Sequence, residues 1–378
     1  MSDLNKAQSQ TGCCPSANSG SGNCCCAPAS SPAPVSAPWI TGRINTPTGA
    51  IPQVSTRLTF YDTLGAWKAR WSIGRMNYKV PPGLYAVGNP GPNSPVLVSA
   101  NYKMSFDRLR QELGGLDLWI LVLDTKGINV WCAAGKGAFG TRELVSRLSS
   151  VKLGEVIDHR RLILPQLGAP GVAAHEVLKL SGFKVFYGPV RAKDIPEYLN
   201  AGMKTTPGMR NVRFGFRDRL VLTPIELVGA FKPALILLGV LFIVNFIMDT
   251  TAPFYLLLGR TLVNFLPYLG ALLVGTVLVP ALLPFIPGRA LAWKGWLLGL
   301  VWAGVYLWLT APAGNWLRIA SHLLLLPSIV SFLAMNFTGA TTYTSLSGVV
   351  KEMKFAIPMQ ISSAGLGVLF MIGKMIVN

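Results

Sequence analysis

The sequence contains few charged residues and very few acidic ones for a chain of 378 residues. Asp, Glu, Lys and Arg together make up 13% of the chain, whereas 51% of its residues are hydrophobic. This composition is unusual for a soluble protein and indicates a membrane region. Charged residues become rare from Leu220 onward, so the sequence divides into a soluble front part and an apolar back part.

Acidic residues are also outnumbered by basic ones, 16 against 34, which gives a net charge of +18. A basic protein can bind nucleic acid, but the sequence lacks a basic stripe with interleaved aromatic residues. Many basic residues instead precede or separate apolar runs, as Arg213, Arg217 and Lys232 do, and this placement is typical of membrane topology signals. We therefore expect no nucleic-acid partner.

The N-terminus lacks the charged start and apolar core of a secretory signal peptide, so we expect the front part to stay in the cytosol. Thiols are kept reduced there, and the six cysteines are better explained as ligands or reactive groups than as disulfides. Residues 1–50 are rich in Ser, Ala, Pro, Gly and Asn, which predicts a disordered arm. Five of the cysteines lie in this arm, namely Cys13, Cys14, Cys24, Cys25 and Cys26.

From about Pro81 to Gly202 the sequence alternates between short apolar runs and helical stretches, which predicts a Rossmann-like α/β domain with a parallel sheet, at residues 51–210. Ligands of such sheets bind beyond the carboxyl ends of the strands, where the glycine-rich loops 125–131 and 167–171 are expected. The expected strands are 96–100, 118–124, 161–166 and 184–187, and the expected helices are 106–113, 132–148, 172–180 and 195–200.

A linker at 211–229 precedes a membrane part at 230–378. The apolar runs of the membrane part are long enough, at roughly 20 residues each, to predict an all-α transmembrane domain of five helices. Basic residues favour one side, which predicts a multi-pass protein of the inner (cytoplasmic) membrane with the front domain in the cytosol and the C-terminus outside. The runs lie near 230–248, 262–286, 295–311, 316–337 and 356–376.

Ionisable residues inside membrane helices mark transport paths, and His322 is the one clear candidate in the sequence. A histidine near a helix end is more often a packed or interfacial residue. We therefore interpret the membrane part as an anchor rather than a transporter.

The most informative segment is NVWCAAGKG at residues 129–137, which follows an expected strand and opens an expected helix. The free N–H groups and the dipole at a helix start favour a thiolate on Cys132, and a thiolate binds soft metals. Small residues beside it leave room for a flat cofactor that Trp131 would border, and Lys136 is either a partner of that cofactor or a solvated side chain. The segment consists of Asn129, Val130, Trp131, Cys132, Ala133, Ala134, Gly135, Lys136 and Gly137.

The segment admits three other interpretations. A phosphate-binding loop needs Gly at position 130 and Ser or Thr at position 137, where Val130 and Gly137 stand. A cysteine nucleophile would need a base, and the soluble part offers only His159 and His175, in no recognisable arrangement. The third interpretation is that Cys132 is a buried small hydrophobic residue, as free cysteines commonly are.

The motifs NVWCAAGKG and GAFGT, with LPQLGAPGVAAHEVLKLSGFKVFYGPVRAKDIPEYL at 164–199, resemble the corrinoid-binding domain of the large subunit of the corrinoid iron–sulfur protein of the acetyl-CoA pathway. Joined to membrane helices, this domain is similar to the HgcA family of mercury-methylation corrinoid proteins, over about residues 80–376. The resemblance implies a cobalamin-type corrinoid whose cobalt takes Cys132 as lower axial ligand. It also implies corrin contacts at Gln166, Leu167, Gly168, Ala169, Pro170, Gly171, Gly188 and Pro189.

Two departures from related proteins matter. The arm cysteines lack the CxxCxxC spacing of an iron–sulfur cluster, so electrons are expected from a ferredoxin-like 4Fe-4S partner, HgcB in that family. The DxHxxG signature of proteins that bind cobalamin through histidine is absent as well, because Asp158 and His159 are adjacent, and a cysteine ligand suits this absence.

The resemblance implies a corrinoid-dependent methyltransferase that is loaded by a methyl-folate methyltransferase and transfers the methyl group from cobalt to Hg(II), producing methylmercury. Mercury is an electrophile, so the methyl group would leave cobalt with its bonding electrons or as a radical. The arm cysteines are then candidate Hg(II) ligands, or part of an unconstrained tail. The alternatives are a membrane-bound corrinoid methyl carrier of one-carbon (acetyl-CoA pathway) metabolism and a transporter with a corrinoid sensor.

Overall fold

The computed structural model describes residues 37–310, 315–341, 344 and 346–377. The five cysteines of the predicted arm lie outside the described residues, so their proposed role stays a prediction. The arm does not extend to residue 50, however. Ile40–Thr46 already form strand β1, and the α/β domain therefore begins earlier than the sequence indicated.

The front part is built on one seven-stranded sheet with the order β1-β2-β3-β5-β4-β6-β7. The pairs β4–β5, β4–β6 and β6–β7 are parallel, whereas β5 pairs antiparallel with β3, so the sheet is mixed rather than purely parallel. The strands are β1 (Ile40–Thr46), β2 (Gly49–Val54), β3 (Gly83–Val87), β4 (Val96–Ala100), β5 (Leu118–Leu123), β6 (Arg161–Leu164) and β7 (Lys184–Tyr187).

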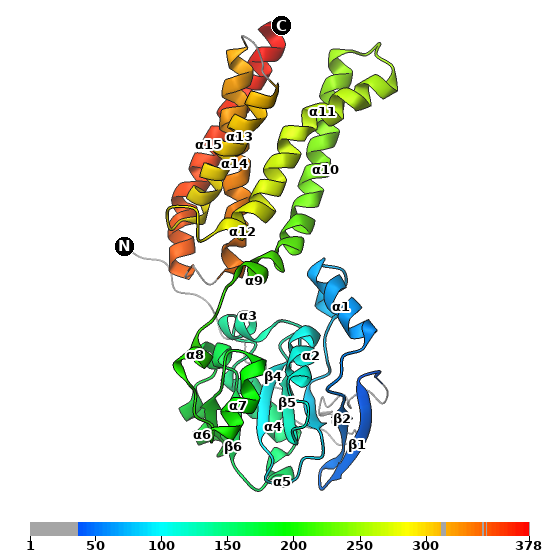
Figure 1. Cartoon of the computed structure of the whole chain (residues 1–378), viewed down its shortest axis with the longest axis vertical. Helices are drawn as coiled ribbons and strands as arrows, with labels where there is room; N and C mark the ends of the chain where they lie inside the picture. The colour runs from blue at the N-terminus through cyan, green and yellow to red at the C-terminus, as the bar shows by residue number, and fades with distance from the viewer. Residues whose placement is uncertain (1–36, 311–314, 342–343, 345, 378) are drawn as a thin grey trace, which may run out of the picture. The chain divides into compact units, whose positions relative to one another are not determined.

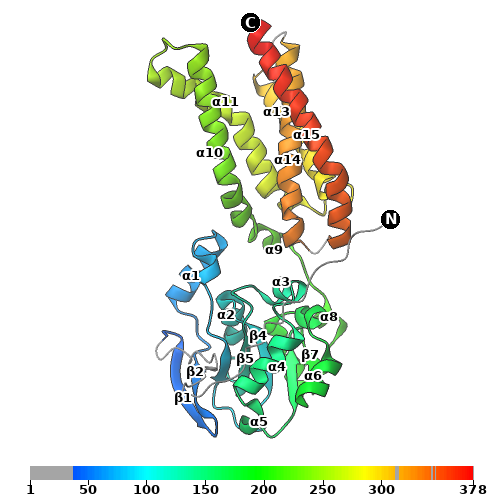
Figure 2. The same ribbon diagram turned by 180° about the vertical axis from the view of Figure 1, so that it is seen from behind.

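Helices cover both faces of this sheet, as the continuous apolar sequence of its central strands requires. Along β5, Ile120 and Val122 point to a core formed with α2 and α7, and Trp119 and Leu121 point to a core formed with α4 and α6. The first pair of helices lies on the face seen in Figure 1 and the second pair on the face seen in Figure 2. The helices are α2 (Lys103–Gln111), α4 (Thr141–Ser150), α5 (Leu153–Val156), α6 (Ala174–Ser181), α7 (Ile195–Asn200) and α8 (Pro207–Arg210).

The predicted strands at 96–100 and 184–187 are confirmed, and the other two are shorter than predicted. The single helix predicted at 132–148 is wrong, because the chain forms α3 (Val130–Gly135) and α4 with a turn between them. Gly137 in that turn has a φ of 77°, a conformation that glycine adopts without strain. The hairpin β1–β2, the strand β3 and the helix α1 (Phe60–Arg70) were not predicted.

The back part is a bundle of apolar helices, and among its described residues four helices are long and apolar enough to cross a membrane. These four are Phe216–Met248, Phe254–Leu282, Trp316–Gly339 and Ser347–Ile376. Within them the structure has α9 (Phe216–Leu220), α10 (Thr223–Met248), α11 (Phe254–Leu273), a π turn η4 (Val274–Leu278), α12 (Val279–Leu282), α14 (Trp316–Asn336) and α15 (Leu346–Val377).

Within the part of the chain that the structure describes, four helices rather than the predicted five are long and apolar enough to cross a membrane. The remaining predicted run forms α13 (Leu291–Thr310), which contains Lys294 and four tryptophans and is not one of these four helices. This helix nevertheless packs within the bundle beside α14 (Figure 1). A Cβ at Gly299 would lie 2.6 Å from the Cα of Pro327, so small residues let the two helices approach closely.

The candidate transport residue, His322, is packed between aromatic rings inside the bundle. Its ring stacks on those of Tyr306 and Tyr268, with centroid distances of 5.3 and 6.5 Å. Its Nδ1 lies 2.8 Å from the carbonyl oxygen of Arg318. These contacts agree with the interpretation of His322 as a packed residue.

A buried group of four charges joins α1 to α2. Lys103 Nζ lies 2.7 Å from carboxylate oxygens of both Asp62 and Asp107. Arg110 is fully buried and donates to the same two residues, through Nη2 to Asp62 at 2.8 Å and through Nε to Asp107 at 2.9 Å. Because each charge has two partners of opposite sign, the group holds α1 in a defined place on the domain.

Burial raises the pKa of Asp62, but hydrogen bonds from Lys103 and Thr59 and the charge of Lys103 outweigh it and hold the pKa well below its usual range. A carboxyl group whose pKa is lowered by folding stabilises the fold above its unfolded pKa, which is 3.8 here. That stabilisation is lost as the pH falls from this value through the folded pKa. At neutral pH it is fully present.

We expect Asp62→Ala to lower the free energy of unfolding by roughly 3–5 kcal/mol at pH 7, because two buried cations then share one carboxylate. Chemical unfolding of the detergent-purified protein measures this, with Thr63→Ala on the exposed side of α1 as the control. The difference between the two variants should persist down to about pH 4 and shrink below it. Equal unfolding of both variants at pH 7 would show that the charges do not hold α1.

Candidate functional site

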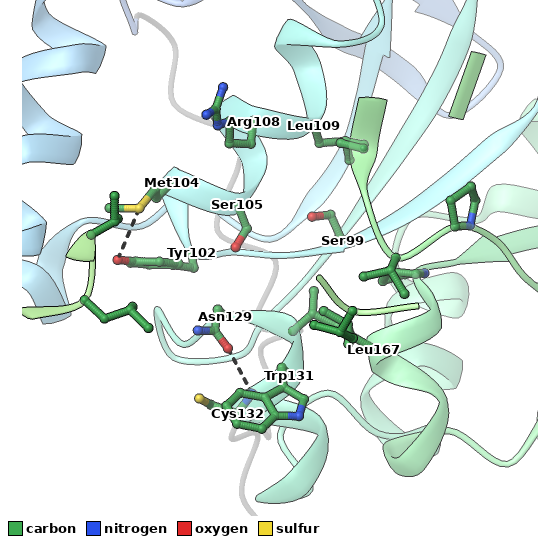
Figure 3. A pocket seen from close by; sticks show the side chains of 18 of the residues that line it. Ser99, Tyr102, Met104, Ser105, Arg108, Leu109, Asn129, Trp131, Cys132 and Leu167 are labelled. Carbon is green, nitrogen blue, oxygen red and sulfur yellow. Dashed lines mark hydrogen bonds between the residues drawn. The ribbon is translucent and has the colours of Figure 1, made fainter. Parts of the chain in front are cut away.

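Cys132 lies in the first turn of α3, just beyond the carboxyl end of β5. Its thiol is free and half-buried, and it is the one cysteine among the described residues. The side chain lines a pocket at the carboxyl edge of the sheet (Figure 3). This is the edge at which parallel sheets bind their ligands, so the location agrees with the sequence prediction.

Residues of β4 and β6, together with residues that follow β5 and β7, form the wall of this pocket in the α/β domain, and most of the lining is apolar. Figure 3 shows Asn129, Trp131 and Cys132 in its lower part, with Ser99, Tyr102 and Ser105 above them. An apolar wall with a few polar groups is typical of a cofactor site. The wall includes Ser99, Tyr102, Met104, Ser105, Arg108, Asn129, Val130, Trp131, Cys132, Leu164, Pro165, Leu167, Gly188 and Pro189.

Asn129 determines where α3 begins. Its backbone is extended, and its side-chain Oδ1 accepts a hydrogen bond of 2.9 Å from the backbone N–H of Cys132. An asparagine at this position satisfies an N–H group that the helix leaves without a partner, which stabilises the helix by about 1 kcal/mol. The cap therefore orients the backbone of Cys132 directly.

Asn101, which follows β4, fixes the turn that leads into α3. It is 1% exposed, and its Oδ1 accepts from the backbone N–H groups of Thr125 and Gly127 at 3.1 and 2.9 Å. Its Nδ2 donates to Asp124 at 3.0 Å. The Thr125 hydroxyl lies 2.9 Å from the same Oδ1 and 2.6 Å from the carbonyl oxygen of Ile128. One buried amide thus connects the end of β4 to the whole turn before Cys132.

The 3₁₀ turn η2 (Gln166–Gly171) packs directly against α3. A Cβ at Gly171 would collide with the carbonyl oxygen of Phe139, and one at Gly168 would collide with the Phe139 ring. Phe139 is fully buried in the core beneath α3. These glycines therefore support α3 from below rather than lining the pocket.

The structure divides the predicted cofactor-binding residues into two groups. Seven of them line the pocket, namely Asn129, Val130, Trp131, Cys132, Leu167, Gly188 and Pro189. Ala133 and Ala134 are buried in the core, and Gly135, Lys136 and Gly137 are exposed on α3 and its end. Gln166, Gly168, Ala169, Pro170 and Gly171 form η2 and stand outside the lining.

Tyr102 and its neighbours were missed by the sequence analysis. Burial raises the pKa of the Tyr102 hydroxyl, an effect that the charges of Arg75 and Arg70 partly offset, so the hydroxyl is neutral at physiological pH. The Arg75 guanidinium lies 5.6 Å from the centroid of the Tyr102 ring. The sequence feature that could have revealed these pocket residues is that residues 101–103 directly follow a predicted strand. Loops that follow parallel strands meet at the ligand-binding edge of the sheet.

The two histidines of the soluble part do not support a nucleophile site. His159 Nε2 lies 2.9 Å from the carbonyl oxygen of Ser94, and His175 is exposed on α6. Neither residue is among those that line the pocket with Cys132. A base for a cysteine nucleophile is therefore not provided by histidine among the described residues.

Residues 71–199 match the family model of the CO dehydrogenase/acetyl-CoA synthase delta subunit. The chain is 32% identical over 127 residues to the acetyl-CoA decarbonylase/synthase complex subunit gamma of Archaeoglobus fulgidus, covering 33% of this chain and 27% of that protein. It is 27% identical over 122 residues to the corrinoid/iron-sulfur protein large subunit of Moorella thermoacetica, covering 32% and 27%. The chain thus spans about a quarter of the length of these curated relatives.

The matched segment begins at the end of α1 and ends within α7, before the first membrane-length helix. It contains α3, with Cys132, and the carboxyl ends of the strands that line the pocket. The similarity to these proteins is therefore confined to the α/β domain, and the apolar helices lie outside the shared segment.

We expect Asn101→Ala to loosen the turn before α3, because two buried N–H groups lose their acceptor at a cost of roughly 1–3 kcal/mol each. Hydrogen exchange of the full chain in detergent should then accelerate across residues 124–135. The control is Asn200→Ala, which changes an exposed asparagine at the end of α7. Unchanged exchange in the Asn101 variant would mean that this amide does not position Cys132.

Proposed function

We propose that the α/β domain binds a corrinoid and that the Cys132 thiolate is an axial ligand of its cobalt. The observation that carries this proposal is the half-buried free thiol of Cys132 in the lining of a pocket at the carboxyl edge of the sheet. A relative named as a corrinoid/iron-sulfur protein large subunit supports the choice of cofactor. The proposed class is a membrane-anchored corrinoid protein of methyl transfer.

The residues present suit such a cofactor. The thiolate is a soft donor, and the described residues contain no group of three or more His, Cys, Asp or Glu side chains that would hold a metal ion by themselves. A site with one protein ligand suits a metal that a macrocycle already holds at its other positions. Trp131 is 40% exposed beside the thiol, and a Cβ at Gly135 would meet no atom within 4 Å, so this part of α3 has open space.

A bound corrinoid would supply the cobalt that carries the methyl group. The chain's own task is to present the sulfur of Cys132 in a fixed direction, which the Asn129 cap and the Asn101 hydrogen bonds achieve. The half-buried guanidinium groups of Arg70 and Arg75 in the lining suit the amide or phosphate groups of the cofactor periphery. Lys136 is exposed at the end of α3 and is a further candidate for such a contact.

The finer proposal is that Hg(II) accepts the methyl group and that methylmercury is the product. Its support is the resemblance to the HgcA family together with the joining of this domain to apolar helices, which the segment shared with the acetyl-CoA pathway relatives does not include. A methyl-folate methyltransferase would load the protein, and a ferredoxin-like 4Fe-4S protein of the HgcB type would supply electrons. The α/β domain would lie in the cytosol and the helices would anchor it in the cytoplasmic membrane.

A second candidate is a membrane-bound methyl carrier of one-carbon metabolism. The names of the matched relatives favour it, because they include subunits gamma of acetyl-CoA decarbonylase/synthase complexes. The two candidates share the corrinoid and Cys132 and differ in the methyl acceptor. They are therefore tested separately.

We expect Cys132→Ala to abolish methyl transfer, with a loss larger than the roughly 10–100-fold that removal of an outer-sphere partner costs. Cys132→His should retain little activity, because imidazole donates less charge than thiolate. The measurements are methylation rate and visible spectrum of anaerobically purified protein, with amounts in the membrane compared first. The control is Ser149→Ala on the exposed side of α4. Equal rates and spectra in all variants would remove Cys132 from the site.

We expect the methyl-loaded protein to transfer its methyl group faster to Hg(II) than to an acetyl-CoA synthase. Isotope-labelled methyl groups followed by mass spectrometry distinguish the two products in one reaction. Faster transfer to the synthase would replace mercury methylation by the one-carbon carrier function, while leaving the corrinoid proposal intact.

A further inference from the structure

Helix α1 and the turn after it expose large apolar side chains on the surface of a folded domain. The exposed residues include three aromatic side chains, which are rarely left in solvent without a binding role when they gather in one segment. The residues and their exposed fractions are Phe60 (74%), Tyr61 (75%), Trp67 (53%), Ile73 (57%) and Met76 (59%).

The charges around these side chains are basic. Arg57, Lys68 and Lys79 are exposed, and Arg70 and Arg75 are half-buried. The only acidic residue between positions 57 and 79 is Asp62, which is buried and paired with Lys103 and Arg110. The outward charge of the segment is therefore positive.

The apolar side chains are held in this exposed position by the structure beneath them. The Thr59 hydroxyl accepts from the backbone N–H of Asp62 at 3.3 Å, and Asp62 accepts from the backbone N–H of Thr59 at 2.9 Å, so both ends of a capping box are formed. The Tyr78 hydroxyl donates to the carbonyl oxygen of Asp62 at 3.1 Å. Together with the buried ion pairs, these contacts prevent α1 from turning its aromatic residues inward.

The end of α1 and the exit of the chain toward the membrane share one edge of the domain. Arg70 and Arg75 belong to the lining of the pocket that contains Cys132, at the carboxyl edge of the sheet. The backbone N–H of Val190, just after β7, donates to the carbonyl oxygen of Met209 in α8 at 2.8 Å. Thus α8 also lies at this edge, and the first membrane-length helix begins a few residues later, at Phe216.

We propose that the exposed aromatic and basic side chains of residues 57–76 bind the headgroup layer of the membrane in which the chain's own helices are embedded. Tryptophan and tyrosine favour the membrane–water interface, and a basic residue near an anionic surface contributes about 1 kcal/mol. Because the helices tether the domain to the bilayer, even weak docking would be populated. The Cys132 pocket would then open close to the membrane surface.

Photocrosslinking of the full chain in lipid nanodiscs tests this docking. Discs of phosphatidylethanolamine and phosphatidylglycerol would carry a lipid with a photoreactive headgroup, and mass spectrometry would locate the crosslinked peptides. Helix α6 is the internal control, because it exposes Leu178 and Leu180 by 49% and 63% on the same domain. We expect crosslinks in residues 57–76 to exceed those in α6 several-fold.

Two variants separate the apolar from the electrostatic contribution. Replacing Phe60, Tyr61 and Trp67 by Ser should reduce crosslinks in this segment several-fold in every disc. Lys68→Glu should reduce them in discs that contain phosphatidylglycerol and change little in discs of phosphatidylcholine alone. Circular dichroism checks that the variants are folded.

The docking proposal would be overturned if crosslinks in residues 57–76 of the unmodified chain were no more frequent than those in α6. This comparison needs no variant. Protection of these residues by an added protein partner but not by lipid would overturn it too, and would assign the surface to that partner. Neither outcome depends on the corrinoid or on the methyl acceptor.

Discussion

The buried carboxamide of Asn101 is the group on which the thiol pocket depends most. Asn101 directly follows β4, and its Oδ1 accepts hydrogen bonds from backbone N–H groups of the turn after β5. These bonds hold the parallel neighbours β4 and β5 in register at their carboxyl ends. From that turn the chain passes into α3, where Asn129 caps the helix and fixes the backbone of Cys132. The glycines of η2 support α3 from the other side by allowing Phe139 to pack beneath it. A single thiol gains a defined direction from these contacts, although α3 itself has only six residues.

A second constraint is the burial of charge beneath α1. Asp62, Lys103, Asp107 and Arg110 neutralise one another in the interior, so the exposed surface of α1 carries aromatic and basic side chains and no acidic one. This surface, the exit of the chain and the Cys132 pocket belong to one edge of the α/β domain. In the proposed account the same edge meets the lipid headgroups and receives the methyl donor, the electron donor and the methyl acceptor. These three partners would therefore approach along the membrane surface.

Whether a segment could be predicted from the sequence depends on how its residues are buried and on how near in the sequence their partners lie. Strands β4 and β7 were predicted because each is one short apolar run flanked by turn residues. Cys132 was predicted as a site residue because its motif follows an expected strand and opens an expected helix. Strand β1 was missed because none of its residues is fully buried, so it has no apolar pattern. Asn101 was missed because its partner Thr125 lies 24 positions away, and no local pattern reveals such a hydrogen bond. The count of membrane helices changed because α13 contains Lys294 and four tryptophans.

The central claim is that the sulfur of Cys132 binds cobalt, and X-ray absorption at the cobalt edge tests it most directly. The account predicts one sulfur scatterer in the first coordination shell of the full-length protein loaded with a cobamide. That scatterer should vanish when residue 132 is alanine. A shell of nitrogen and oxygen alone in the unmodified protein would contradict the assignment of Cys132 as the axial ligand.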